Sequence, residues 1–269
     1  MQKSLMCWSA VAVGFASIAR GQVFDGRAQF STTTNPAGAW SYGWQPAIDA
    51  GFTLLTHQTV VGGGASFWDL PGSPPSIGKN ISDHPILIAD NPVVRAGVTM
   101  FHPGPNNQRG VVRWTAPAAG SANVFIHVGG VAIDPEFAST DVAILLNGSI
   151  LAASSNYNNA FTYSFYQRVE VLPGSTIDLS QGFGTNGSYL NDSTAFRFTV
   201  VLNQCIADLN ADGVVDDSDF AVFAPAYNIL DCADPAMSPG CPADINHDGV
   251  VDDVDFGFFV PQYNALVCP

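Results

Sequence analysis

Short runs of Val, Ile, Phe and Thr recur along the first two thirds of the chain, between clusters of Gly, Pro, Asn and Ser. Helical periodicity is nearly absent from this part. Runs of this length and composition are typical of β-strands joined by tight turns. We therefore predict strands over residues 52–61, 93–101, 111–115, 124–128, 142–146, 164–171, 176–179 and 195–202.

The last of these segments alternates most clearly between apolar and polar positions. Phe196, Phe198, Val200 and Leu202 occupy every second position, as expected of an antiparallel strand with one face in a core. Many short strands with turns such as Asn147-Gly148 fit two packed antiparallel sheets. The predicted fold class is mainly β: an antiparallel two-sheet, jelly-roll-like sandwich over residues 22–203, followed by a small α-helical module over residues 204–269.

Three large aromatic residues alternate near the start of the predicted sandwich, namely Trp40, Tyr42 and Trp44. In an extended strand all three project to one face. Such a row either fills the core, which is the commoner use of large aromatic residues, or forms an exposed platform on which sugar rings stack. The core interpretation is favoured, and under the second interpretation these three residues are the candidate ligand-binding site.

Several segments of the predicted sandwich resemble jelly-roll modules of secreted bacterial proteins. They are the aromatic stretch of residues 35–46, VVRWTAP at 111–117, LLNGSIL at 145–151 and VLPGSTIDL at 171–179. Some of those modules bind carbohydrate. The resemblance therefore implies recognition of extracellular polysaccharide, or attachment to a surface, by this part of the chain.

Near the C-terminus a twelve-residue segment occurs twice at an offset of 36 residues, as DLNADGVVDDSD and DINHDGVVDDVD. Asp or Asn stands at positions 1, 3, 5, 9 and 12 of each segment, and Gly at position 6. Alternating oxygen ligands, a glycine at the sharp bend and a closing carboxylate are what an EF-hand-like calcium loop requires. We therefore predict two Ca²⁺ sites, with ligands from Asp208, Asn210, Asp212, the Val214 carbonyl, Asp216 and Asp219, and from Asp244, Asn246, Asp248, the Val250 carbonyl, Asp252 and Asp255.

Apolar residues at helical spacing follow each loop and predict one buried helix face. No amphipathic helix precedes either loop, because Cys205 and Cys241 stand three residues upstream. The predicted unit is therefore a loop followed by one helix. The expected buried residues are Phe220, Phe223, Ala224 and Tyr227 in the first helix and Phe256, Phe259, Val260 and Tyr263 in the second.

The duplicated loop and helix of residues 204–269 resemble a type I dockerin module. The resemblance implies a partner, a cohesin-like domain on a scaffold or a cell-surface receptor. In that family the partner is contacted largely from positions 10, 11, 17 and 18 of each repeat. These positions are Asp217, Ser218, Ala224, Pro225, Asp253, Val254, Val260 and Pro261. A proline inside a helix removes a backbone donor and is expected to shorten or kink it.

Residues 1–21 are typical of a secretory signal peptide, with Lys3 before an apolar stretch and small residues before Gln22. The apolar stretch is too short to span a bilayer, and no other run of about 18 apolar residues occurs. We therefore predict a secreted or cell-surface protein without a transmembrane segment.

Export makes disulfides the expected state of the cysteines, because thiols stay reduced mainly in the cytosol. Cys205, Cys232, Cys241 and Cys268 all lie in the duplicated module at repeat-equivalent places. Two connectivities respect the repeat: Cys205–Cys232 with Cys241–Cys268, or Cys205–Cys268 with Cys232–Cys241. Antiparallel packing of the two helices favours the second.

Charge is distributed unevenly along the chain. The formal net charge is −14, and residues 204–269 contain twelve Asp and no Glu, Lys or Arg. The predicted sandwich is nearly neutral, which argues against nucleic acid or an anionic membrane as a partner.

Motifs of hydrolases are absent from the sequence, since there is no HExxH helix and no GxSxG turn. His57, His84, His102 and His127 are scattered. We therefore predict no catalytic residue. A glycoside hydrolase, which needs two carboxylates at a defined separation in a cleft, is the class predicted if the chain is an enzyme.

Three interpretations follow. The favoured one is an exported, non-catalytic protein with a calcium-binding, dockerin-like module and a β-sandwich that recognises polysaccharide or attaches to a surface. The second is a structural cell-surface or matrix protein whose C-terminal module is a calcium-stabilised cap. The third is a carbohydrate-active hydrolase on a jelly roll.

Overall fold

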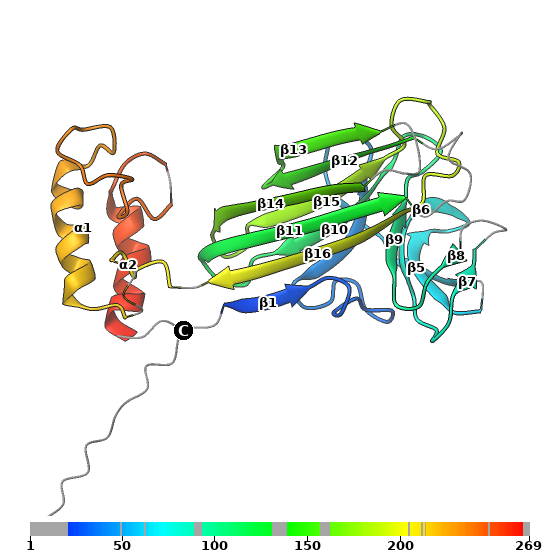
Figure 1. Ribbon diagram of the computed structural model, residues 1–269, viewed down its shortest axis with the longest axis horizontal. Helices are drawn as coiled ribbons and strands as arrows, with labels where there is room; N and C mark the ends of the chain where they lie inside the picture. Colours follow the sequence, from blue (N-terminus) through cyan, green and yellow to red (C-terminus); the bar gives the residue numbers. More distant parts are fainter. Residues whose placement is uncertain are drawn as a thin grey trace, which may run out of the picture.

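The computed structural model describes residues 21–48, 50–61, 63–88, 93–130, 139–156, 162–203, 205–210, 212, 214–246 and 248–265. The predicted signal peptide, apart from Gly21, and Cys268 lie outside these residues. The described part divides into a two-sheet β-sandwich and a pair of helices that lies beyond one end of it (Figure 1).

The sandwich consists of antiparallel sheets. In the eight-stranded sheet the order is β14 (Thr162–Val171), β11 (Gly120–Gly130), β16 (Thr194–Asn203), β9 (Thr99–His102), β6 (Ser73–Asn80), β5 (Ala65–Leu70) and β4 (His57–Val61), and β1 (Gln22–Asp25) pairs with β16. The six-stranded sheet has the order β13 (Ser149–Asn156), β12 (Thr140–Leu146), β15 (Thr176–Gly182), β10 (Arg109–Thr115), β2 (Trp40–Gln45) and β3 (Thr53–Leu54). A short ribbon pairs β7 (Ile86–Leu87) with β8 (Val93–Val94).

One apolar core lies between the two large sheets. Trp40 of β2 packs edge-on against Phe198 of β16, with ring centroids 5.0 Å apart, and Phe24 of β1 packs on Trp114 of β10 at 5.4 Å. Each pair joins one sheet to the other, so the inner faces of the sheets enclose a shared core. The prediction of a mainly β, antiparallel two-sheet sandwich is confirmed.

The strand predictions are confirmed where alternation is strong. Phe196, Phe198, Val200 and Leu202 of β16 are all buried, and the Asn147-Gly148 turn has both residues at positive φ. Two predicted strands are wrong as continuous segments. Residues 52–61 divide into β3 and β4, which belong to different sheets, and residues 93–101 divide into β8 and β9 at a turn that includes Gly97 at φ 70°.

The C-terminal module consists of α1 (Asp217–Ile229) and α2 (Asp253–Ala265) with their preceding loops. The Tyr227 hydroxyl near the end of α1 donates to Asp253 at the start of α2. The Tyr263 hydroxyl near the end of α2 donates to Asp217 at the start of α1. The helices are therefore antiparallel, and the two contacts are related by the repeat offset. Within the described residues no helix is long and apolar enough to cross a membrane.

Two expectations for these helices are wrong in part. Pro225 and Pro261 lie inside α1 and α2, and each helix continues past its proline, so neither is shortened there, while a kink at the proline stays a prediction. Phe220 and Phe256 do not belong to a buried face, since each is 42% exposed. The two-helix contact buries a narrower stripe, in which Phe223 stacks on Phe259 with centroids 4.9 Å apart.

The described cysteines follow the across-repeat pattern. Cys232 and Cys241 form a disulfide, and Cys205 is also disulfide-bonded. The Cys232–Cys241 bond excludes the within-repeat pairing of Cys205 with Cys232. It closes the connection between α1 and the second loop, as expected from the antiparallel helices.

Candidate functional site

The two predicted calcium loops have the same internal hydrogen bonds. The amide of position 5 donates to the carboxylate of position 1, at 3.0 Å between Asp212 and Asp208 and at 3.1 Å between Asp248 and Asp244. The same amide reaches the Asn oxygen of position 3, and the amide of position 7 reaches the carboxylate of position 5, in both loops. Each loop is therefore curled so that its side-chain oxygens turn back along the backbone.

The carboxylate at position 12 is the most enclosed group of each loop. Asp219 and Asp255 are 0% exposed. Asp219 accepts hydrogen bonds from the amides of Leu209, Asn210 and Asp216 at 2.7, 3.1 and 2.9 Å, and Asp255 accepts the three repeat-equivalent bonds at the same distances. Position 12 thus ties both ends of the loop together. It is also the third residue of the helix, and in α1 it completes a capping box with Asp216.

A buried carboxylate is costly unless hydrogen bonds or a cation compensate its charge. The three amides supply hydrogen bonds, but residues 204–269 contain no Lys or Arg. The ligand set is made of carboxylate and amide oxygens, which suits a hard cation such as Ca²⁺. The residues present therefore fit calcium on both charge and ligand type.

The carboxylates of one loop do not all converge. Within the described residues, the one group of three metal-ligating side chains within 4.8 Å of one another is Cys232, Cys241 and Asp244. The two cysteines are joined in a disulfide, so this group is no thiolate metal site. Asp212 and Asp248 are exposed. The Ser218 hydroxyl and amide hold the pKa of Asp216 below its usual range.

The aromatic row of β2 lies in the sandwich core rather than on a platform. Trp40 is 1% exposed and donates its indole N–H to the Gln29 side chain at 2.8 Å, and Tyr42 is fully buried against Phe30. Trp44 is partly buried against the same core. The platform interpretation is therefore wrong for Trp40 and Tyr42, because β2 lies inside its sheet beside β10 and contributes these rings to the space between the sheets.

A different aromatic pair is exposed on the outer face of the eight-stranded sheet. Phe125 of β11 and Tyr166 of β14 lie directly opposite each other in register, with centroids 4.8 Å apart. They are 44% and 64% exposed. The sequence contained a signal for this pair, because Phe125 alternates with the apolar residues Val124 and Ile126 and therefore points away from the core. Neither residue is among the candidates predicted from the sequence.

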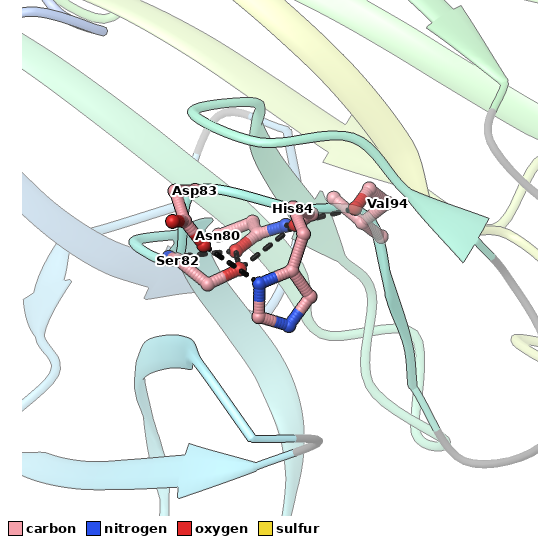
Figure 2. A network of polar contacts seen from close by, with 5 residues as sticks. All are labelled: Asn80, Ser82, Asp83, His84 and Val94. Carbon is pink, nitrogen blue, oxygen red and sulfur yellow. Dashed lines mark hydrogen bonds and ion pairs between the residues drawn. The ribbon is translucent and has the colours of Figure 1, made fainter.

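The loop histidine His84 has a structural role. Asn80 of β6 donates its amide N–H groups to the backbone carbonyls of His84 and Val94, both at 2.9 Å, and Ser82 donates to Asn80 at 2.7 Å (Figure 2). The exposed His84 ring contacts only the neighbouring Asp83 within this network. These bonds anchor the loop to β8, and they assemble no nucleophile with the histidine.

A cavity of about 460 Å³ near β5 and β6 is lined by Asp69, His102 and Ser193, among others. Asp69 and His102 form hydrogen bonds to other groups and not to each other. Asp69 binds His57 at 2.6 Å, and the His102 ring donates to the Pro103 carbonyl at 2.8 Å. Burial lowers the pKa of His102, so its ring is neutral near pH 7. In the part of the chain that the structure describes, no hydrogen bond links these groups into a triad.

Asp192 has the raised pKa of a general acid, but it is closed to substrates. Burial raises the pKa of Asp192 to about 8, against the opposing effect of the Ser139 amide, and the nearby charge of Asp141 adds to the increase. Asp192 is 1% exposed, and its second oxygen has no hydrogen-bond partner. A glycosidase acid needs a raised pKa and also access to the sugar. Asp192 meets only the first requirement.

Asp192→Asn is expected to stabilise the sandwich at alkaline pH. Between pH 4 and 8 the unfolded Asp192 is ionised while the folded one keeps its proton, so this residue makes stability fall as pH rises. The asparagine cannot ionise, and we expect it to raise the free energy of unfolding by about 1–3 kcal/mol at pH 8 and by much less at pH 4. Urea denaturation at both pH values measures the difference. Equal effects of the substitution at the two pH values would contradict the raised pKa.

Comparisons with known proteins identify no family. No family model and no curated protein matches the chain. Solved structures that match include the carbohydrate-binding module CBM51 of Clostridium perfringens GH95 in complex with methyl-galactose, at 16% identity, 46% coverage of this chain, 87% of that chain and a TM-score of 0.30. A family 35 carbohydrate-binding module from Clostridium thermocellum matches at 12% identity, with 51% and 97% coverage and a TM-score of 0.27.

Rabbit GITRL also matches, at 18% identity, 34% coverage of this chain, 69% of that chain and a TM-score of 0.25. All three TM-scores lie below 0.5. The matches therefore carry no argument about what this chain binds, and the function has to be inferred from its own residues.

Proposed function

We propose that the protein is an exported, non-catalytic, two-module protein. Its C-terminal module binds two Ca²⁺ ions, and its β-sandwich recognises extracellular polysaccharide. The observation that carries the calcium assignment is the pair of fully buried carboxylates, Asp219 and Asp255, in a module that contains no Lys or Arg. Calorimetric titration of the full chain with calcium should report two sites, and no heat at millimolar calcium would refute this assignment.

The C-terminal module is proposed to act as an attachment module, as its resemblance to a dockerin implies. Positions through which that family contacts cohesin are solvent-accessible here, among them Ser218, Pro225, Val254 and Pro261. An attachment module holds the protein on a cohesin-like scaffold or surface receptor only while calcium is present. The alternative, a calcium-stabilised cap, binds no such partner with or without calcium.

The polysaccharide assignment is supported by the outer face of the eight-stranded sheet. Phe125 and Tyr166 present two adjacent rings to solvent on neighbouring strands. Exposed aromatic rings lose little conformational entropy when they bind a ligand, and they offer a large apolar contact to the flat face of a sugar. The ordered strands below them fix their separation, so this site is preformed.

Tyr166→Ala and Phe125→Ala are each expected to weaken retention on insoluble polysaccharide about tenfold, since truncation of an anchor residue in a binding site costs about 1–2 kcal/mol. Melting temperature should be unchanged, because both rings are exposed. Ile150→Ala is the matched control, because Ile150 is 52% exposed but lies on the other sheet. Retention of both ring variants at the level of the parent would exclude this face as the binding site.

A further inference from the structure

A pocket lies where β16 changes its neighbouring strand. Along one edge of β16, residues 194–196 pair with β9 and residues 199–202 pair with β1, while β11 pairs along the whole of the other edge. Arg197 and Phe198 lie at the gap between β9 and β1. The gap opens into a pocket of about 470 Å³, lined by Asp25, Arg27, Lys79, Gly97, Arg197 and Thr199.

The three basic residues of this pocket are not neutralised by ion pairs. Elsewhere in the sandwich Arg109 pairs with Asp141 at 2.5 Å and Arg113 with Asp178 at 2.7 Å. Within the described residues, Arg27, Lys79 and Arg197 have no carboxylate within 4.0 Å. Instead Arg27 donates to the Gly97 carbonyl at 2.7 Å, and Lys79 donates to the Arg27 carbonyl at 2.6 Å. Carbonyls position these two cations without cancelling their charge.

The acidic residue of the pocket is already engaged by the backbone. Asp25 accepts hydrogen bonds from the amides of Arg27 and Ala28 at 2.8 and 2.9 Å, which closes the turn after β1. Burial lowers the pKa of Lys79, the positive charge of Arg27 lowers it further, and Asp25 opposes both effects. The pocket therefore carries a net positive charge that the near-neutral composition of the sandwich conceals.

The pocket adjoins the exposed aromatic pair. Thr199 and Arg197 of β16 lie directly opposite Phe125 and His127 of β11, and opposite residues of an antiparallel pair project to the same face of the sheet with Cβ atoms about 4.5–5.5 Å apart. Phe125 in turn lies opposite Tyr166. Two lining residues of the pocket, Arg197 and Thr199, thus share the outer face of the sheet with the two rings across three neighbouring strands.

We propose that this pocket binds the anionic group of an acidic polysaccharide, a carboxylate or a sulfate ester, while a neighbouring sugar of the same chain stacks on Phe125 and Tyr166. The planar guanidinium group donates two parallel hydrogen bonds to such oxyanions, and Arg197 both lines the pocket and is exposed to solvent. The inference rests on the proposed polysaccharide recognition and narrows it to one chemical class of polymer.

The test compares the full chain, in calcium-containing buffer, with three soluble polymers. Dextran is neutral, hyaluronan carries carboxylates and dextran sulfate carries sulfate esters, so the two acidic polymers distinguish the source of the anion. The parent should bind one acidic polymer at least tenfold more tightly than dextran. Arg197→Gln should reduce that affinity about tenfold, and Arg197→Glu about a hundredfold, with unchanged melting temperature. Arg95→Gln is the matched control, because Arg95 is an exposed arginine outside the pocket.

Failure of the pocket assignment can be distinguished from failure of the proposed polysaccharide recognition. If Tyr166→Ala weakens polysaccharide binding about tenfold but dextran binds as tightly as the acidic polymers and Arg197→Gln has no effect, the pocket assignment is overturned while the proposed function stands. Binding to none of the three polymers, nor to insoluble polysaccharides, overturns both. Dimerisation in sedimentation experiments that Arg197→Glu abolishes, without polymer binding, would instead assign the pocket to the acidic C-terminal module of a second copy.

Discussion

Removal of calcium is expected to unfold the C-terminal module and leave the β-sandwich folded. Each twelve-residue loop contains five carboxylates, two of them exposed, and the module has no Lys or Arg to offset their repulsion. Without the ion, the buried charges of Asp219 and Asp255 are compensated by hydrogen bonds alone. Calcium that binds only the folded module stabilises it by about 2.7 kcal/mol per site at a concentration 100 times Kd.

The sandwich should be unaffected because the two modules have separate cores. Among the residues that the structure describes, Phe223 and Phe259 belong to a cluster that contains no residue of the sandwich, and the sandwich core contains none from the helices. The two can be observed independently. The described tryptophans all lie in the sandwich, so tryptophan fluorescence reports its folding, while the ellipticity at 222 nm is dominated by α1 and α2.

Addition of a chelator should therefore abolish the helical signal and leave tryptophan fluorescence unchanged. Asp212→Ala and Asp248→Ala should each remove one site. Asp234→Ala is the control, since Asp234 is an exposed acidic residue of the same module outside both loops. Persistence of the helical signal in excess chelator would contradict the role of calcium as a folding ligand.

The loss of one site should also weaken the other. Tyr227 of the first repeat hydrogen-bonds to Asp253, which follows Asp252, the proposed position-9 ligand of the second loop, and Tyr263 makes the equivalent bond to Asp217. Each helix thus depends on the first turn of its partner. We expect the remaining site in Asp212→Ala to bind calcium more weakly than either site of the parent, which the same calorimetric titration measures.

The features of the fold that the sequence predicted correctly are those determined by local spacing. An amphipathic strand such as β16 needs only its own alternation, and the helix after each loop follows from apolar residues at helical spacing. The calcium ligands also rest on spacing within twelve residues, and they stay a prediction. Strand β6 was missed, because its sequence SPPSIGKN has two prolines and little alternation, and β13 was missed because it is rich in Ala and Ser. Pairing with β5 and β12 stabilises these strands, and no local pattern encodes that pairing.

The candidate sites on the sandwich were harder to predict for the same reason. Arg27 and Lys79 are 52 residues apart, and Arg197 lies much farther along the chain. Only the sheet order β16, β9, β6 and the position of β1 bring them to one pocket. The alternation of Trp40, Tyr42 and Trp44 was visible, but whether that face is the inner or the outer one depends on where β2 lies in its sheet.

Trp40→Ala is expected to destabilise the sandwich by about 3–5 kcal/mol, as large-to-small substitutions of buried Trp and Phe typically do. The ring is 1% exposed and fills the space between the sheets. Its removal leaves a cavity beside Phe198 and leaves the Gln29 side chain without its indole partner. Gly26 lies against the same ring, where an added Cβ would be 3.2 Å from Trp40 Cη2, so the surroundings are already tightly packed.

Urea denaturation followed by tryptophan fluorescence measures this loss, because Trp44, Trp68 and Trp114 remain as reporters. Trp40→Phe is the matched variant: it keeps most of the apolar volume, so it should cost distinctly less than the alanine. Tyr166→Ala should leave the free energy of unfolding within about 0.5 kcal/mol of the parent, as surface substitutions usually do. If instead Trp40→Ala were as stable as the parent and had lost glycan binding, Trp40 would have to be a surface ligand, and the assignment of its ring to the shared core of the two sheets would be wrong.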